Sequence, residues 1–376
     1  MAQLILTFAP SILNLPPVSG TIYNFNAGPS ILPKEVFEQA SAAILNFQDT
    51  GLSILEYGHR TPAFEAVMEE ARQLVKELMQ LDADHEVLFL HGGSTTQFMQ
   101  VPVNLLPDDG LASYTETGTW ANKAIKEAKL YGHVEIAGSS RDTNFTSIPK
   151  QLTVSPTAAY LHITTNETIA GTQWHQLPYD CGVPLVADMS SDVLSRVLDF
   201  NKFDLIYAGA QKNIGAAGVN LAVINKNILN KTGRKIPTIL DYQNHIKEGS
   251  MLNTPPVFAV YVCMLTLRWL KAQGGVAGIE KINDQKASLL YDTLDAIPLF
   301  NKPIAKEDRS KMNVVFTMND PALEKEFLDL CKQENMIGVK GHRSVGGFRV
   351  SLYNAMPLSG VEAITQLIKT FATKKG

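Results

Sequence analysis

Cysteine is scarce in this chain of 376 residues. Its three cysteines, Cys181, Cys263 and Cys331, are odd in number and far apart. Such a set cannot hold together a small disulfide-rich domain, and it suits a reducing compartment, so we expect a cytoplasmic location. An excess of one charge is also missing, because 33 Lys and Arg against 37 Asp and Glu give a formal net charge of −4. This balance gives no reason to expect nucleic acid or an anionic membrane as a partner.

Long uninterrupted apolar runs are absent as well. Residues 1–33 carry no charged side chain, but prolines, glycines and asparagines interrupt them before a membrane-spanning length is reached. No Lys or Arg precedes the apolar stretch at 4–6, which argues against a secretory signal. We therefore expect no membrane span, and residues 1–20 are an extension without an assigned role.

What the sequence does contain is an alternation of helical and strand patterns. Apolar residues at helical spacing predict helices that begin at Pro33, Pro62 and Trp120. Short apolar runs bounded by turn-forming residues are typical of strands covered on both faces, and they span 86–91, 158–164, 183–187, 203–208 and 219–224. The alternation predicts an α/β fold with a mostly parallel central sheet.

The pattern changes after a long apolar helix predicted at 257–273, for which Asn253-Thr254-Pro255-Pro256 forms the expected cap. This helix is apolar nearly all round, so we expect it in a core or a subunit interface. Helices at 279–297, 322–334 and 359–373 then alternate with strands at 313–318 and 348–352, which predicts a separate α+β module. We expect three parts: an N-terminal extension with a segment joining the small domain (1–30), a large domain (31–277) and a small C-terminal domain (278–376).

Three segments that follow predicted strands carry candidate site residues, because open parallel sheets bind ligands at the carboxyl ends of their strands. The first is His91-Gly92-Gly93-Ser94-Thr95-Thr96, where glycines and a helix start favour a bound phosphate. The alternative is a tight turn with Ser94 as the helix N-cap. The segment matches neither GxGxxG nor GxxxxGK[ST], so the sequence does not support a dinucleotide or ATP.

The other two segments supply an acid and an amine. Asp188 ends an apolar strand, where it could hold a cationic ring nitrogen or a metal, or could simply cap a turn. Lys212 is the only charged residue between Asp204 and Lys226, and desolvation would favour the neutral amine that a Schiff base requires. The alternative is a lysine that extends from a loop into solvent. The 24 residues between Asp188 and Lys212 allow one connection and one strand, so both could point into one crevice.

Two His-Arg pairs form a fourth candidate feature, His59-Arg60 and His342-Arg343, and Arg349 follows the second pair within a predicted strand. Arginine binds carboxylate and phosphate in a bidentate manner, and histidine adds a donor. The set suits a small ligand with several negative charges. The alternative is a solvated basic loop.

Together these segments resemble the phosphoserine aminotransferases, a fold-type I, class V family of pyridoxal 5′-phosphate (PLP) enzymes. The resemblance covers about residues 23–375 in family order, and Asn166-Glu167-Thr168-Ile169 and the Lys-Gly-His-Arg-Ser-Val-Gly-Gly stretch at 340–347 are its most specific parts. It implies a large PLP-binding domain with a smaller α+β domain, and a homodimer with shared active sites. It implies that Lys212 is the Schiff-base lysine and proton shuttle and that Asp188 bonds the pyridine nitrogen. Trp120 would stack on the cofactor ring, and Thr168 would bond on its oxygen-bearing side. The cofactor phosphate would be bound by Ser94, Thr95 and Gln211, and by Asn253 and Thr254 of the neighbouring subunit.

The resemblance also implies the substrates and the reaction. Arg349 would hold the substrate α-carboxylate, and the distal phosphate or carboxylate would lie on His59, Arg60, His342 and Arg343. The reaction would be ping-pong transamination, 3-phosphohydroxypyruvate plus L-glutamate giving O-phospho-L-serine plus 2-oxoglutarate, in serine biosynthesis. Some members also transaminate the phosphorylated threonine precursor of vitamin B6. This chain departs from the family pattern at Ser94-Thr95-Thr96, where some members have an arginine, and at Gly58, where serine is usual.

Other interpretations stay open beside this one. An alanine–glyoxylate type aminotransferase shares the class but has little use for two His-Arg pairs. A cysteine desulfurase needs a cysteine on a mobile loop, whereas Cys331 lies in a predicted helix. A phosphate-ligand binding protein without catalysis is the non-enzyme alternative. No HxxxH or CxxC spacing is present, so we expect no metal site.

Overall fold

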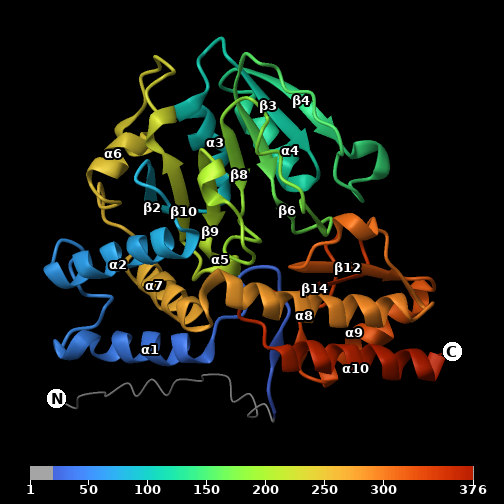
Figure 1. The fold of residues 1–376 in the computed structure, drawn as a ribbon. Coiled ribbons are helices and arrows are strands. Elements are labelled where there is room, and N and C mark those ends of the chain that lie inside the picture. The colour runs from blue at the N-terminus through green and yellow to red at the C-terminus, as the bar shows by residue number, and fades with distance from the viewer. Residues whose placement is uncertain (1–19, 376) are drawn as a thin grey trace, which may run out of the picture.

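A seven-stranded sheet forms the centre of the larger part of the molecule in the computed structural model, which describes residues 20–375 (Figure 1). The expected extension over 1–20 therefore lies, apart from Gly20, outside the described residues. The strands follow one another across the sheet in this order: β2 (His85–His91), β10 (Val219–Asn225), β9 (Leu205–Gly209), β8 (Leu185–Asp188), β5 (Ala158–Thr164), β3 (Leu111–Glu116) and β4 (His133–Ser139). Only β10 runs antiparallel to its neighbours, and the other adjacent pairs are parallel. The predicted α/β fold with a mostly parallel sheet is confirmed.

The strands that the sequence predicted are buried on both faces, and their observed ends lie within two residues of the predicted ones. Two strands of this central sheet were not predicted. Strand β3 contains Ser, Tyr, Thr and Glu, and it can be buried because these groups have hydrogen-bond partners. The hydroxyls of Tyr114 and Tyr160, for example, are hydrogen-bonded at 2.8 Å. Strand β4 is an edge strand with exposed polar residues, so it has no continuous apolar run.

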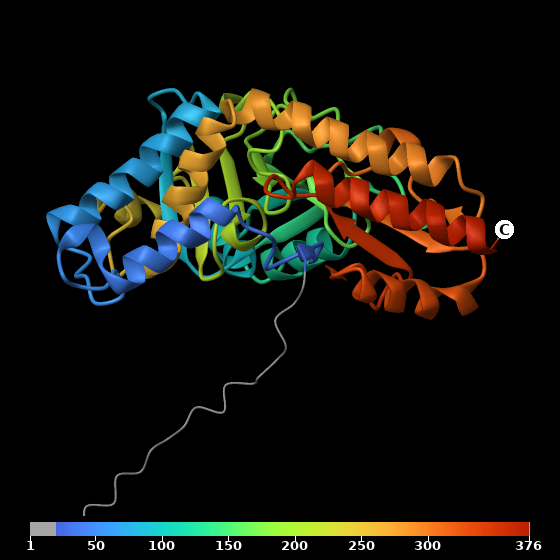
Figure 2. The ribbon, with the colours of Figure 1, turned by 90° about the horizontal axis from the view of Figure 1, so that it is seen from below.

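Helices cover both faces of this sheet (Figures 1 and 2). Alternate residues of β2 separate the two faces, since Phe89 belongs to one hydrophobic cluster whereas Leu88 and Leu90 belong to another. The first cluster includes residues of α1 (Lys34–Leu45), α2 (Pro62–Met79) and α7 (Val257–Ala272). The second includes residues of α3 (Ser94–Leu105), α4 (Thr119–Ala128) and α6 (Tyr242–Lys247). No helix in this part of the chain or in the rest of residues 20–375 has the length and apolar character needed to cross a membrane.

Helix α7 is buried along most of its length, as its composition predicted. Its expected cap is wrong, however. Pro256 is the N-cap residue, and no side chain bonds the start of the helix, so Asn253 and Thr254 have no capping role. Proline has no acceptor on its side chain, so it cannot bond the free N–H groups of the first turn.

The smaller part of the molecule has its own sheet and core. Strand β12 (Asn313–Met318) lies between β11 (Phe300–Asn301) and β14 (Phe348–Ser351), all antiparallel. Helices α8 (Gly275–Asp295), α9 (Glu324–Gln333) and α10 (Leu358–Lys375) contribute residues to this core. The N-terminal segment also joins it, because β1 (Tyr23–Asn24) pairs in parallel with β13 (Met336–Ile337) and Phe25 is buried among the same residues.

A buried polar network links the two parts beside the sheet. Asn313 Oδ1 accepts a hydrogen bond from Asn166 Nδ2 of the larger part at 2.8 Å. Asn313 Nδ2 donates to Ser351 Oγ at 3.0 Å and to Tyr353 Oη at 3.2 Å. Tyr353 Oη in turn donates to the Ala27 carbonyl at 2.7 Å. The network therefore holds β14 against a hairpin of the larger part.

Replacing Asn313 should test the strength of this link. Asn313→Ala removes donors and an acceptor from buried partners, so we expect a loss of about 1–3 kcal/mol in the free energy of unfolding. The loss should appear as a lower midpoint of urea unfolding followed by tryptophan fluorescence. The control is Asn227→Ala at an exposed position. An Asn313→Ala midpoint equal to that of the control would contradict the importance of the network.

Candidate active site

One cavity at the carboxyl ends of the parallel strands gathers half of the candidate residues. Asp188 is the last residue of β8, and Lys212 belongs to α5 (Ala210–Asn213), which directly follows β9. Because β8 and β9 are parallel neighbours, both side chains emerge at the same edge of the sheet. The cavity is lined by Gly93, Ser94, Thr95, Trp120, Thr164, Asn166, Thr168, Asp188, Ser190, Ser191, Gln211 and Lys212. Seven of the predicted site residues, from five separate segments, thus meet at one place.

The carboxylate of Asp188 is buried, with 4% of the residue exposed. Its Oδ1 accepts hydrogen bonds from the backbone N–H of Ser190 at 2.9 Å and from the Ser190 hydroxyl at 2.5 Å. Burial raises the pKa of Asp188, while the Ser190 bonds and the charge of Lys212 oppose that rise. Both bonds fall on Oδ1, so the geometry leaves Oδ2 for a cationic group in the cavity.

The amine of Lys212 belongs to another lining residue of the same cavity. Its Nζ donates to Thr168 Oγ1 at 2.7 Å and lies 5.3 Å from the centroid of the Trp120 ring. Burial lowers the pKa of Lys212 from 10.5 to about 8, an effect that Asp188 and Glu167 partly offset. A lysine with such a pKa has an appreciable neutral fraction near neutral pH, which a nucleophilic amine needs.

The Gly-Gly-Ser-Thr segment forms the start of α3 at one end of the cavity. Its N-cap is Gly93, and no side chain caps the helix, so the alternative of Ser94 as N-cap is wrong. The Ser94 hydroxyl instead contacts the Ser190 hydroxyl and accepts from the Gly209 N–H at 3.1 Å. The first N–H groups of a helix have no partner within it, which makes this end of the cavity suitable for an anion.

A basic rim, consisting of Arg349, His342 and Arg343, adjoins the cavity. Arg349 of β14 is half-buried, and its Nη1 donates to the Thr168 carbonyl at 3.3 Å. Burial, together with the charges of Arg349 and Arg343, lowers the pKa of His342, so these groups lie within electrostatic range of one another. Arg343 itself is exposed.

Seven candidate residues do not line this cavity. Three of them form the basic rim, and the other four are His59, Arg60, Asn253 and Thr254. The segments that carry these four lie near the start of α7. Tyr57 packs on Phe47 with ring centroids 5.1 Å apart, and Phe47 packs on Tyr261 of α7 at 5.6 Å. Asn253 and Thr254 immediately precede the same helix. In Figure 1, α2, which begins just after His59-Arg60, runs beside α7.

Sequence reasoning gave no role to Ser190, Asn166 or Glu167. Ser190 bonds Asp188, and a serine two residues after an aspartate at a strand end is a signal for this turn. Glu167 and Asn166 form the short strand β6 (Asn166–Glu167), paired with β7 (Thr172–Gln173), beside the cavity. Their signal was limited to the resemblance, since their partners Trp120 and Asn313 are remote in sequence.

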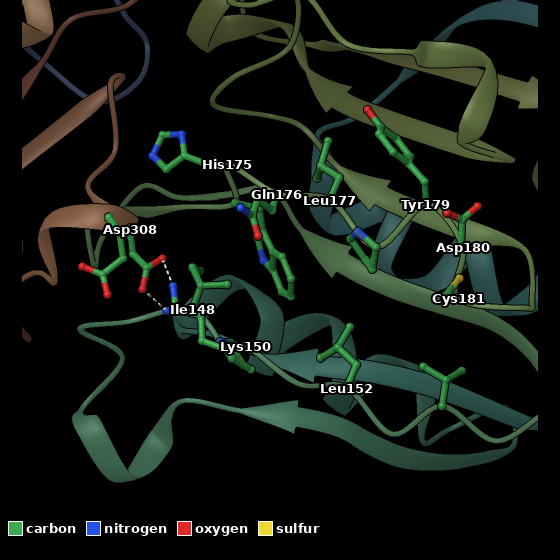
Figure 3. A pocket seen from close by; sticks show the side chains of 15 residues that line it. Ile148, Lys150, Leu152, His175, Gln176, Leu177, Tyr179, Asp180, Cys181 and Asp308 are labelled. Carbon is green, nitrogen blue, oxygen red and sulfur yellow. Dashed lines mark hydrogen bonds and ion pairs between the residues drawn. The ribbon is translucent and has the colours of Figure 1, made fainter.

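A larger cavity lies elsewhere and shares no residue with this one (Figure 3). One of the acidic residues that line it, Asp308, already accepts hydrogen bonds from the Ile148 N–H at 2.9 Å and from Lys150 Nζ. His175 Nε2 lies 2.9 Å from the Arg309 carbonyl. Within residues 20–375 no three His, Cys, Asp or Glu side chains converge as metal ligands would. The arrangement of a low-pKa amine, a buried acid and a helix N-terminus is found at the Lys212 cavity.

Comparisons with known proteins show the family of the chain. The family model for class V aminotransferases matches residues 22–364. The phosphoserine aminotransferase of Flavobacterium johnsoniae is 54% identical over 353 residues, which are 94% of this chain and 99% of the relative. The solved phosphoserine aminotransferase from Bacillus circulans subsp. alkalophilus has a TM-score of 0.92 at 43% identity, over 95% of this chain and 99% of that one. The PLP-bound phosphoserine aminotransferase from Trichomonas vaginalis has a TM-score of 0.88 at 35% identity, over 93% and 100% of the two chains.

The lowered pKa of Lys212 can be measured in the cofactor-free protein. A base with a lowered pKa becomes neutral at lower pH, so trace labelling of Lys212 by acetic anhydride should rise with pH and level above about 8. A lysine in an unstructured peptide in the same solution should keep gaining reactivity to above pH 10. Peptide mass spectrometry gives both labelling ratios. A Lys212 profile that follows the peptide would show that burial does not depress its pKa.

Proposed function

The chain belongs to the class V aminotransferases, and we propose that it carries out phosphoserine transamination with PLP as its cofactor. It transfers the amino group of L-glutamate to 3-phosphohydroxypyruvate, giving O-phospho-L-serine and 2-oxoglutarate, a step of serine biosynthesis. The observation that carries this function is the single cavity in which Lys212, Asp188 and the start of α3 meet, in a chain about half identical to phosphoserine aminotransferases over nearly its whole length. The alanine–glyoxylate and binding-protein alternatives are not favoured by these relatives.

The cavity residues fit PLP. The Oδ2 of the buried Asp188 is available to a protonated pyridine nitrogen, and the uncapped start of α3, with Ser94 and Thr95, suits a phosphate. Gln211 lines the same end, Trp120 offers a ring face, and Thr168 lies within hydrogen-bond distance of Lys212 Nζ. When bound, PLP supplies an electron sink that makes the substrate Cα–H acidic.

The roles of the protein groups follow from their surroundings. The Lys212 amine would hold the cofactor aldehyde and would carry the proton between the substrate Cα and the cofactor side. Thr168 Oγ1 orients Nζ, and Asp188 keeps a positive charge on the ring nitrogen opposite. The Ser190 bonds hold the carboxylate in one orientation, so its free oxygen points in a constant direction.

The basic rim accounts for the substrates. Glutamate and phosphoserine each have an α-carboxylate and a distal anion. We assign the α-carboxylate to Arg349 and the distal phosphate or carboxylate to His342 and Arg343, with His59 and Arg60. One rim can therefore serve both halves of the ping-pong reaction. The phosphorylated threonine precursor of vitamin B6 has the same two anionic groups, so its transamination is a second reaction of this site.

We assign the remaining candidates to a homodimer with shared sites. His59, Arg60, Asn253 and Thr254 gather around the start of α7 rather than at their own cavity, as a contribution to a partner's site requires. His59 Nε2 is buried without a partner within residues 20–375. Apolar side chains on α1 and the loop after it are exposed, with exposed fractions of 55% at Phe37, 81% at Leu45 and 63% at Leu55. A second copy would cover such a surface.

The domain division and the location belong to the same proposal. Residues 31–277 form the PLP-binding domain, 278–376 form the small domain, and the end of the 1–30 segment joins the small domain. The two hydrophobic cores support a division near this point, since the first extends along the chain to Ile279, with Ile282 packed against it, and the second begins at Ala287. Tyr23, Phe25 and Ile31 of the N-terminal segment pack with the second core. The location is cytoplasmic, in keeping with three free cysteines.

Removing the amine should abolish the reaction. Lys212→Ala is expected to lose phosphoserine turnover by at least about 10³-fold, because covalent attachment and proton transfer both need Nζ. The measurement is 2-oxoglutarate-dependent consumption of phosphoserine, compared with alanine as donor. Lys126→Ala, on the exposed side of α4, is the matched control. Near-normal turnover by Lys212→Ala, or a preference for alanine over phosphoserine, would contradict the proposed function.

Subunit mixing tests the shared site. Lys212→Ala and Arg60→Ala homodimers should each be nearly inactive. If Arg60 serves the partner's cavity, random heterodimers contain one site with both groups, so a one-to-one mixture regains up to about a quarter of wild-type activity. The activity is measured after subunit exchange has been verified with tagged chains. No regain in a mixture that has exchanged would place Arg60 in its own subunit's site.

A further inference from the structure

Glu167 is a fully buried carboxylate beside the cavity that has no part in the roles assigned above. It is 0% exposed and lies on β6, between Asn166 and Thr168. Its Oε1 accepts from the backbone N–H of Ala121 at 3.0 Å, and its Oε2 accepts from the backbone N–H of Trp120 at 3.3 Å. Glu167 therefore binds the first turn of α4, the turn that carries the Trp120 ring.

The start of α4 depends on this carboxylate. Gly118 is the N-cap residue, and no side chain of the helix's own segment caps it. Glu167 packs directly over Gly118, since a Cβ at that position would lie 2.5 Å from the Glu167 carboxyl carbon. A negative charge at a helix N-terminus is favourable, and here it comes from a strand 46 residues away in sequence from Ala121.

The residue that follows this strand binds the reactive amine of Lys212. That residue, Thr168, accepts from Lys212 Nζ through its hydroxyl, and its carbonyl accepts from Arg349. Glu167 thus joins two walls of the cavity, the Trp120 wall on α4 and the Thr168 wall in the turn directly after β6. Its contacts fix the separation between the indole ring and Lys212 Nζ, which is 5.3 Å to the ring centroid.

We propose that Glu167 is a positioning residue that holds the Trp120 ring against the cofactor face by fixing the first turn of α4 to strand β6. This inference rests on the proposed function. A serine at position 118 would cap the helix without burying a charge, so capping alone does not explain a carboxylate at this depth. Burial raises the pKa of Glu167 to about 7, and the two N–H bonds and Lys212 oppose that rise.

The test is a double-mutant cycle on PLP affinity. PLP dissociation constants are measured by equilibrium dialysis for wild type, Glu167→Gln, Trp120→Ala and the double variant. Glutamine keeps one acceptor oxygen and the side-chain volume but loses the second acceptor. If Glu167 acts through Trp120, Glu167→Gln should weaken PLP binding about tenfold in the wild-type background and less than about twofold in the Trp120→Ala background.

Two further variants keep the test sharp. Gly118→Ala should displace the Glu167 carboxyl and reproduce the loss of PLP affinity without changing either key side chain. Glu135→Gln is the matched control, because Glu135 also accepts a backbone N–H, from Ser155 at 2.8 Å, but lies on β4 away from the cavity. Its PLP affinity should equal that of wild type. Quenching of tryptophan fluorescence by PLP should decrease in Glu167→Gln and stay unchanged in Glu135→Gln.

The outcomes separate this inference from the proposed function. Equal losses of PLP affinity for Glu167→Gln in the two backgrounds would show a general structural role and overturn the inference alone. A Glu167→Gln protein that binds PLP as tightly as wild type would also overturn it. A wild-type protein that binds no PLP would overturn the proposed function, and the inference with it.

Discussion

The site depends on removing one amine from water beside one acid. Lys212 is uncharged more readily than an ordinary lysine because burial penalises its ammonium form, and Asp188 limits that effect because it lies within electrostatic range. The pKa of each group therefore depends on the presence of the other. Without Asp188 the pKa of Lys212 would be lower still, and without the charge of Lys212 the pKa of Asp188 would be higher still. The parallel pairing of β8 and β9 meets this constraint, because it brings the ends of two adjacent strands to one edge.

Much of the fold follows from the sequence by simple physical rules, and the exceptions have physical causes. Strands such as β5 and β9 are apolar on both faces, so their composition alone predicts burial in a parallel sheet. Strand β3 escaped prediction because its buried polar groups are satisfied by partners on other strands, which only the folded chain reveals. The polar cap expected for α7 is absent because Pro256, which has no side-chain acceptor, occupies the N-cap position.

The site residues likewise fall into those that the sequence predicts and those that only the folded chain reveals. Asp188, Lys212 and the Ser94-Thr95 pair could be chosen from their positions after strands, because a parallel sheet sends all its strand ends to one edge. That Trp120 and Thr168 belong with them came only from the family resemblance. Ser190 and Glu167 act on other residues rather than on a ligand, and the contact of Glu167 spans 46 residues. His59-Arg60 could be chosen as an anion-binding pair, but its position away from the cavity depends on how α2 packs along α7, which no local pattern encodes.

The arrangement of charge explains how a weakly acidic chain can build an anion site. The cavity keeps its acids, Asp188 and Glu167, buried and bonded to backbone N–H groups, so their charge is directed inward. Beside the cavity, Arg349 is half-buried and Arg343 is exposed. Under the proposed function, a dianionic substrate would bind this basic rim, while the acids act over short range on Lys212 and on α4. Local order of charge, rather than the net charge of −4, decides what this cavity binds.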